Sequence, residues 1–287
     1  MKTNLLLLDS YKNMEDLVQI ALPISNHYNR KLKIIYVFDF NWMRQAAFAG
    51  GAGTSGISIV NAEREIFADY ETAEKKVKKV VDECLKKQSA KYPVEISVSK
   101  NNRIDLIKRE LQNDPDLIVL ISNRQSYSEI TGGAISYPKF IEHVNCPVLI
   151  LPDKLKHTTF HNAVYASDYN PEDVRSLKHL SNFLEQSGNT HLTILHNEEN
   201  FDFDAKLKWI GFKDVVQSEI SDGNLDFLIK KKKDFIKGME EYNLESDPDL
   251  LVMLNEKKGF FEDIFSSGTT KNMLTHFDKP LLVYHEK

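Results

Sequence analysis

Residues Asp114–Ser122 read DPDLIVLIS, and residues Asp247–Asn255 read DPDLLVMLN. The second stretch begins 133 positions after the first (247 − 114 = 133). At the same offset, Cys146-Pro147-Val148-Leu149-Ile150 returns as Lys279-Pro280-Leu281-Leu282-Val283. Two landmarks that keep one register without a gap indicate a duplicated domain. A functional site is therefore expected in one copy, in both copies or at the seam between them.

The bulk composition is that of an ordinary globular protein. The chain has 287 residues, of which 41% are hydrophobic and 28% are charged, and this length suggests two domains of about 140 residues each. Its net charge of −5 gives no electrostatic footprint for nucleic acid. We interpret the basic run Lys230–Lys233 as the solvated face of a helix. We therefore predict no nucleic-acid partner.

The cysteine content and the apolar runs bear on the compartment. Cys84 falls in a helical pattern and Cys146 at the start of a strand, so we predict no disulfide framework. No His and Cys residues have the spacing of metal ligands. The apolar run Leu5–Leu8 is too short for a signal peptide, and no run approaches the roughly 18 residues of a membrane span. We expect a cytoplasmic protein with neither a metal nor a membrane contact.

The first half alternates short apolar runs with helical patterns. Apolar runs of this kind are typical of strands buried on both faces, and they occur at Leu5–Leu8, Ile34–Phe38, Val94–Val98, Leu117–Ile121 and Val148–Leu151. Apolar residues three and four apart predict helices over 14–28, 66–84 and 104–111. Pro23 is expected to kink the first helix or to end it early.

The second half repeats this alternation. We predict strands at Ala163–Ala166, Leu192–Leu195, Val215–Ile220, Leu250–Leu254 and Leu281–Tyr284, and helices over 174–184, over 225–236 and around Lys230–Tyr242. Alternating strands and helices predict parallel sheets with right-handed crossovers. The predicted fold class is α/β, with two tandem doubly wound five-stranded parallel sheets of Rossmann-like type. The predicted domains are residues 1–153 and 159–287, joined by a short linker.

Gly51-Ala52-Gly53-Thr54-Ser55-Gly56 has the letters of a dinucleotide fingerprint. In such a site the glycines directly follow a strand and open a helix, so that free backbone N–H groups meet the pyrophosphate. Here the predicted strand ends near Phe38, and Ile57 stands where a phosphate-binding P-loop carries lysine. We interpret the segment as a surface insert, and a lid over a ligand is the alternative.

Ligands of open parallel sheets bind beyond the carboxyl ends of the strands, where the strand order reverses. The candidates are the residues that follow the predicted strands: Asp9-Ser10, Phe38-Asp39, Lys100-Asn101 and Ser122-Asn123 in the first half, and Ser167-Asp168, His196-Asn197, Ser221-Asp222 and Asn255-Glu256 in the second. Their polar groups could bind a ribose or a base edge. The alternative for Asp9 and Asp168 is that each caps the helix after it.

A further candidate precedes the predicted helix at Lys271–Leu274. Ser266-Ser267-Gly268-Thr269-Thr270 combines hydroxyl residues with a glycine, and the free N–H groups of a helix start bind anions. An ordinary N-cap with a turn glycine is the alternative. The first half has Ile135-Ser136 at the positions of Gly268-Thr269, so it lacks this feature or has shifted it.

Taken together, these stretches resemble the universal stress protein family in its tandem two-domain form. The resemblance spans nearly the whole chain. It is carried by Asp9-Ser10, by Asp168-Tyr169-Asn170-Pro171-Glu172, by the two Pro-Asp-Leu strands, and by the endings His143–Ile150 and His276–Val283. It implies a fold like that of the adenine nucleotide alpha hydrolases, a pseudo-twofold pairing of the domains, and a stress-related role.

Members of that family that bind ATP carry a glycine, two residues, a glycine, nine residues, and then glycine with serine or threonine. With Gly268-Thr269 as the last pair, Asn255 and Lys258 stand where the first two glycines belong. Both copies depart from the motif, because the first half has Ser122, Gln125 and Ile135-Ser136 there. If one half binds a nucleotide, ATP or AMP, the second half is favoured. Its predicted ligand residues are Asp168, Asn255, Gly268, Thr269 and Thr270.

We predict a binding protein and not an enzyme. The sequence shows no Ser-Gly-Gly-x-Asp-Ser loop, no His-x-Gly-His motif and no nucleophile elbow. A nucleotide-dependent hydrolase or transferase of the same α/β superfamily is the alternative, and a slow hydrolysis of ATP is left open. The partners we expect are a small-molecule ligand and, by pairing of Val148–Leu151 with Leu281–Tyr284, an internal pseudo-dimer. Both a monomer and a homodimer remain open.

Overall fold

The fold is described here from a computed structural model of the chain. It describes residues 1–8, 11, 13–37, 56–100, 103–123, 141, 143–220, 224–231, 235–255 and 279–286, apart from the side chains of 56–67, 69 and 235–240. The chain divides into two compact units, Met1–Cys146 and Pro147–Lys287. The predicted domain limits, 1–153 and 159–287, stay a prediction.

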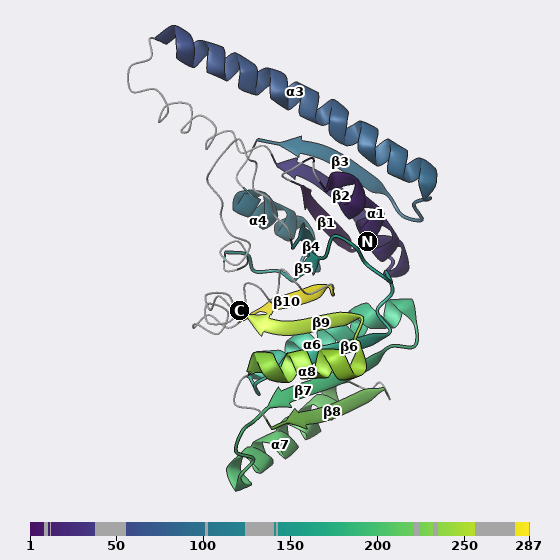
Figure 1. Cartoon of the computed structure of the whole chain (residues 1–287), viewed down its shortest axis with the longest axis vertical. Coiled ribbons are helices and arrows are strands. Elements are labelled where there is room, and N and C mark those ends of the chain that lie inside the picture. The colour runs from purple at the N-terminus through teal and green to yellow at the C-terminus, as the bar shows by residue number, and fades with distance from the viewer. Residues whose placement is uncertain are drawn as a thin grey trace. The chain divides into compact units, whose positions relative to one another are not determined.

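The first unit is an open parallel sheet with helices between its strands (Figure 1). Its elements are β1 (Thr3–Leu8), α1 (Met14–His27), β2 (Lys31–Val37), α3 (Gly56–Lys87), β3 (Val94–Ser99), α4 (Arg103–Asn113) and β4 (Ile118–Ser122). The strand order is β3-β2-β1-β4, so the order reverses between β1 and β4. This reversal makes a topological switch point at the carboxyl ends of β1 and β4.

The second unit repeats this strand order. Its elements are β5 (Val148–Leu151), β6 (Asn162–Ser167), α6 (Pro171–Leu184), a 3₁₀ turn (Glu185–Ser187), β7 (His191–Asn197), α7 (Phe203–Glu219), β8 (Leu225–Lys230), α8 (Phe235–Ser246), β9 (Leu250–Asn255) and β10 (Leu281–His285). Five parallel strands run in the order β10-β9-β6-β7-β8, with the switch point between β6 and β9.

Strand β5 pairs with β10 in the antiparallel sense, with Leu149 opposite Leu282. The predicted pairing of these two edges is therefore confirmed. The parallel α/β fold class is confirmed as well, while the predicted fifth strand of the first half, β5, lies in the second unit and adds an antiparallel strand to its sheet.

The central strands are fully buried, as the apolar runs predicted. Every residue of β1, β4, β5, β9 and β10 is buried. For the parallel strands among them this is expected, because helices cover a parallel sheet on both faces. Strands β3 and β8, which end the strand order, instead alternate half-buried and exposed side chains over their first four residues. Helix α3 buries Ala73, Val77, Val81 and Cys84 at spacings of four, four and three, as expected for one helical face.

Two predicted elements of the second half are wrong. Val215–Ile220 was predicted as a strand but forms the end of α7, and the residues predicted as a helix from Leu225 form β8. Helix α7 begins because the Asp202 side chain accepts a hydrogen bond of 2.9 Å from the backbone N–H of Ala205. Leu225, Phe227 and Ile229 lie half-buried on one face of β8, which is a period of two that the helical interpretation overlooked.

Two further predictions change in their extent. The helix predicted around Lys230–Tyr242 is α8 and begins at Phe235, because Lys230 still belongs to β8. Helix α1 passes through Pro23 and ends at His27, so the proline does not end it early.

The repeated Asp-Pro-Asp stretch has a structural role in each unit. In the second unit the Asp249 carboxylate accepts hydrogen bonds of 3.0 Å from the backbone N–H groups of His161 and Asn162, which lead into β6. In the first unit the Asp116 carboxylate lies 3.4 Å from the Lys2 ammonium group, at the start of β1. The third residue of the motif thus ties the start of β4 to the start of β1, and the start of β9 to the start of β6.

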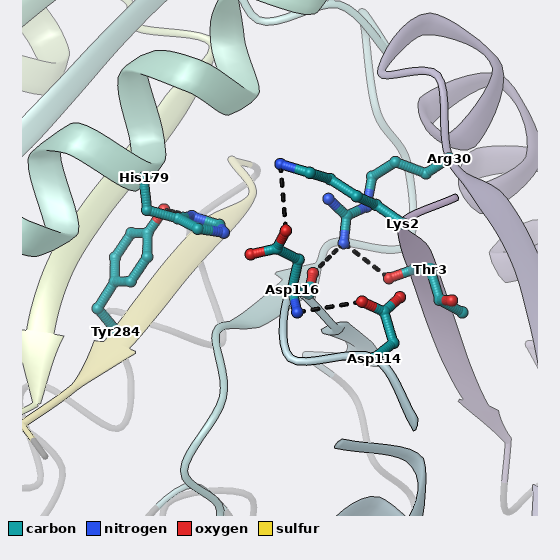
Figure 2. A network of polar contacts seen from close by, with 7 residues as sticks. All are labelled: Lys2, Thr3, Arg30, Asp114, Asp116, His179 and Tyr284. Atoms are coloured by element: carbon teal, nitrogen blue, oxygen red, sulfur yellow. Dashed lines mark hydrogen bonds and ion pairs between the residues drawn. The ribbon is translucent and has the colours of Figure 1, made fainter. Parts of the chain in front are cut away.

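Arg30 provides a second tie in the first unit (Figure 2). Its side chain is only 2% exposed. Nη2 donates a hydrogen bond of 2.8 Å to the carbonyl oxygen of Thr3 and a second one to the carbonyl oxygen of Asp116. One guanidinium therefore joins the amino ends of β2, β1 and β4, and hydrogen bonds from a charged donor are stronger than neutral ones.

Within the ranges described above, no helix is long and apolar enough to cross a membrane. The glycine-rich segment Gly51–Ser55 lies outside those ranges, so its interpretation as an insert or a lid stays a prediction.

Candidate functional site

The site predicted for the second unit falls at its switch point. The last registered pair of β6 and β9 is Ala166 with Met253. Asp168 lies two positions after Ala166, and Asn255 lies two positions after Met253. Both residues therefore stand at the carboxyl edge of the sheet where its strand order reverses. Gly268, Thr269 and Thr270 lie outside the described residues, and the structure leaves their prediction untested.

Asn255 carries a buried polar atom that needs a partner. The residue is 7% exposed, and its backbone carbonyl accepts a hydrogen bond of 3.2 Å from the N–H of Glu286. Among the described residues, its side-chain Oδ1 has no hydrogen-bond partner. A buried amide oxygen without a donor costs about 1–3 kcal/mol, so this atom is suited to accept a hydrogen bond from a ligand.

Asp168 does not cap the following helix, so the alternative interpretation of this residue is wrong. The N-cap of α6 is Asn170, whose side chain accepts a hydrogen bond of 2.9 Å from the backbone N–H of Glu172. Pro171 occupies the first turn, where its missing N–H has no cost. Asp168 is exposed at the strand end.

Replacing Asn170 by alanine is expected to lower the stability of the second unit by about 1 kcal/mol, because α6 loses its N-cap. Aspartate at this position keeps the acceptor and is the matched control. Chemical denaturation of the two variants should separate them, and an alanine variant as stable as the aspartate variant would contradict this role.

A groove between α6 and α7 opens beside Asp168. It encloses about 780 Å³, and its walls carry Asp168, Tyr169, Pro171, Val174, Lys208, Gly211, Phe212, Val215 and Glu219. Asn255 does not line it. The two predicted residues therefore border the carboxyl edge from different sides, with Asp168 on the side of the groove.

A buried network fixes the end of β6 beneath this edge. The Asp173 carboxylate is 1% exposed and accepts hydrogen bonds of 2.7 Å from the Tyr165 and Ser167 hydroxyls. Ser167 Oγ in turn accepts a hydrogen bond of 3.2 Å from the backbone N–H of Tyr169. Burial, and then the adjacent Asp173 carboxylate, raise the pKa of Tyr165 well above its ordinary value. The phenol therefore stays protonated and donates.

His196 closes the site on the side of β7. Its Nδ1 lies 2.7 Å from the carbonyl oxygen of Ser167, which assigns the proton to Nδ1 and leaves Nε2 as an acceptor. The side chain is 6% exposed. Burial lowers the pKa of His196, against the opposing effects of the Ser167 carbonyl and of Glu198.

The buried imidazole predicts a loss of stability in acid. The pKa of His196 is lower in the folded state than its ordinary value of about 6.5. As the pH falls below about 6.5, His196 takes up a proton in the unfolded chain but stays neutral in the folded chain. The free energy of unfolding therefore decreases between about pH 6.5 and the lower pKa of the folded state. His196→Phe should remove this part of the pH dependence, whereas changing the half-exposed His191 should retain it. Chemical denaturation at several pH values between pH 7 and pH 5 tests this. If the free energy of unfolding depended on pH in the same way for the His196 and His191 variants, the prediction would be contradicted.

Aromatic side chains gather over His196. The Tyr169 ring stacks on the imidazole with 3.8 Å between centroids. The ring centroids of Trp209 and Phe212 on α7 lie 5.9 Å and 5.5 Å from that of Tyr169. Tyr169 has a φ of 70°, a left-handed conformation that costs a non-glycine residue on the order of 1 kcal/mol or more. Such strain at a strand end is common at functional sites.

Sequence reasoning missed several of these groups. His196 was named only as a polar residue that follows a predicted strand, and Tyr165, Asp173 and the Tyr169 stack were not singled out. A signal for Asp173 exists in the pattern Asn-Pro-Glu-Asp, which places it in the first turn of α6, facing back toward β6. The pair Ser221-Asp222 was assigned to a strand end, but it follows helix α7 and lies outside the described residues.

The matching edge of the first unit is only partly described. Asp9, Ser10, Asp39 and Asn101 lie outside the described residues, and Ser122 is buried at the end of β4. Within the described ranges of both units, no group of three His, Cys, Asp or Glu side chains could hold a metal ion.

The described units define an open parallel α/β protein with Rossmann-like strand order. No protein-family model matches the sequence, and no characterised protein matches it in sequence. Among solved structures, a universal stress protein from Archaeoglobus fulgidus is similar with a TM-score of 0.62 and 12% identity, over 99% of this chain and 96% of that chain. A protein described as a universal stress protein from Pseudomonas aeruginosa gives 0.52 and 12% identity, over 99% and 92%.

The chain therefore has the fold of the universal stress proteins, and the predicted resemblance is confirmed at the level of the fold. The cytoplasmic domain of a prokaryotic cation chloride cotransporter is also similar, with a TM-score of 0.52 and 8% identity over 99% of this chain and 95% of that chain.

Proposed function

We propose that the chain is a stress-response binding protein of the universal stress protein type, whose second unit binds a nucleotide, ATP or AMP. The observation that carries the proposal is the buried Oδ1 of Asn255, which has no partner among the described residues and stands at the switch point beside Asp168. A small molecule at this edge would supply the missing donor.

The two described residues divide the recognition between them. Asn255 Oδ1 accepts a hydrogen bond from a ribose hydroxyl or an amino group of the ligand. The exposed Asp168 carboxylate accepts a second one from the side of the groove. We assign the phosphates to Gly268, Thr269 and Thr270 on the chemistry of the sequence, because hydroxyls and free N–H groups at a helix start bind anions.

The fold is compatible with this proposal but does not distinguish it from other functions. Two similar proteins carry the name universal stress protein, whereas a third is part of a transporter. One fold serves several functions, and the site has to decide between them. The site residues described here are acceptors at a strand edge, which suits binding and regulation.

Calorimetry with ATP and with AMP tests the proposal. We expect binding to the unmodified chain and at least a tenfold loss for Asn255→Leu, because one buried hydrogen bond contributes on the order of 1.5 kcal/mol. Ser122→Ala, at the matching position of the first unit, is the control and should keep the affinity. No heat with either nucleotide would contradict the proposal.

The role we propose is non-catalytic. With Mg²⁺ and a high protein concentration, the amounts of ATP and AMP should stay constant over hours. Chromatographic detection of ADP, AMP or a transferred group at a rate that scales with protein concentration would favour the hydrolase or transferase alternative.

A further inference from the structure

Each unit stacks one of its own tyrosines on a ring near the end of a strand, which is β2 in the first unit and β7 in the second. In the second unit Tyr169 stacks on His196, with centroids 3.8 Å apart and planes at 28°. In the first unit Tyr11 stacks on Tyr36, with centroids 5.0 Å apart and planes at 14°. His196 forms the last registered pair of β6 and β7, with Ser167, and Tyr36 forms the last registered pair of β1 and β2, with Leu8. The two stacks are therefore at equivalent places.

The stack of the second unit lies beside the candidate site. Strand β6 has β9, which carries Asn255, on one side and β7, which carries His196, on the other. Tyr169 directly follows Asp168 and lines the same groove. The edge thus has a polar side at Asn255 and an aromatic side at His196, and the aromatic side is filled by the Tyr169 ring.

With the Tyr169 ring in this place, two buried polar atoms lack hydrogen-bond partners among the described residues and one backbone conformation is unfavourable. The Tyr169 hydroxyl is buried and, in the part of the chain that the structure describes, has no hydrogen-bond partner. The same holds for Nε2 of His196, whose nearest acidic atom is Oε2 of Glu198 at 3.8 Å. The backbone of Tyr169 is left-handed as well. Two of these features belong to Tyr169 and one to His196 beneath it, and local conflicts of this kind are expected at functional sites.

We propose that the Tyr169 ring is a displaceable occupant of a slot for a planar nitrogen heterocycle. When Tyr169 swings out, its hydroxyl reaches water and Nε2 of His196 becomes accessible. The heterocycle then stacks on the imidazole, as the tyrosine did, and Trp209 borders it from α7. Aromatic side chains bind planar rings by stacking, and every purine offers a flat aromatic face for this contact.

This inference rests on the proposed function for the rest of the ligand, but the slot can be tested alone. The probe is free adenine, which has no ribose and no phosphate. Tyr169→Asn removes the ring and tolerates the left-handed backbone, and Tyr169→Phe keeps the ring and is the matched control. We expect at least a tenfold gain in adenine affinity for Tyr169→Asn over the unmodified chain, and less than a threefold change for Tyr169→Phe. Calorimetry and quenching of Trp209 fluorescence report the binding.

A second variant and a second measurement keep the test decisive. Tyr169→Gly suits the left-handed backbone best and should show the same gain if the asparagine variant fails to fold. In the unmodified chain, millimolar adenine should abolish the nuclear Overhauser contact between the Tyr169 and His196 rings. Unchanged adenine affinity in folded ring-less variants, or adenine bound with that contact intact, would overturn the slot.

The two proposals fail in different ways. If ATP binds to the unmodified chain while removal of the Tyr169 ring gives no gain for adenine, the slot is wrong and the nucleotide site stands. If adenine binds to Tyr169→Asn while neither ATP nor AMP binds to the unmodified chain or to the variant, the slot stands and the proposed function is wrong.

Discussion

Arg30→Met is expected to lower the free energy of unfolding of the first unit by about 3 kcal/mol or more. The variant removes the charged donor of two backbone carbonyls, those of Thr3 and Asp116, and a hydrogen bond to a charged group contributes roughly 1.5–3 kcal/mol. Methionine retains much of the apolar stem, so the loss reports the guanidinium and not the packing volume. The amino ends of β1, β2 and β4 should loosen together.

Hydrogen exchange is the suitable measurement, because a chain of two units does not have to unfold in one step. Protection of the β1 and β4 amides should fall, while the amides of β6 and β9 keep theirs. Lys31→Met is the matched control: Lys31 is the next residue and pairs with Glu95 at 3.2 Å in a partly exposed ion pair, which contributes less than about 1 kcal/mol. Equal effects for the two variants would contradict the role of Arg30.

Asp173→Ala is expected to have an effect of similar size in the second unit, about 3 kcal/mol. It leaves the buried Tyr165 and Ser167 hydroxyls without their acceptor, and each buried unsatisfied group costs about 1–3 kcal/mol. The end of β6 and the start of α6 are held by these bonds. The position of Asp168 and Tyr169 depends on them, so ligand binding should weaken along with stability.

A double-mutant cycle separates the network from the packing. Tyr165→Phe and Ser167→Ala each remove one donor, and Asp173→Asn keeps an acceptor oxygen and should lose less than Asp173→Ala. We expect the effects of Tyr165→Phe and Asp173→Ala to be strongly non-additive, because both delete the same 2.7 Å hydrogen bond. Simple additivity in chemical denaturation would show that the network is not coupled.

Most of the fold could be predicted because buried parallel strands are continuous apolar runs. Leu5–Leu8 and Leu250–Leu254 are short, apolar and bounded by polar residues, and both are strands. The two wrong predictions, a strand within α7 and a helix at β8, show where this signal fails. Over six residues at a sheet edge, Leu225, Leu228 and Ile229 fit a helical period about as well as Leu225, Phe227 and Ile229 fit a strand.

The candidate site could be predicted only in outline. The rule for strand ends placed Asp168 and Asn255, because topology alone brings such residues to one edge. It could not show that Asn170, and not Asp168, caps α6, since both are good N-cap residues two positions apart. Nor could it show Arg30 or His196 as buried partners, because their hydrogen bonds reach backbone carbonyls that lie 27 and 29 residues away in the chain.

The proposed function places a ligand at the carboxyl edge of the parallel strands of the second unit, between Asp168 and Asn255. An NMR titration of the labelled chain with AMP is the decisive experiment, because it reports the place of binding as well as its occurrence. We predict saturable shifts of the Asn255 side-chain amide and of the backbone amides at Asp168 and Tyr169. Shifts confined to Met1–Cys146, or none at millimolar AMP, would contradict the claim.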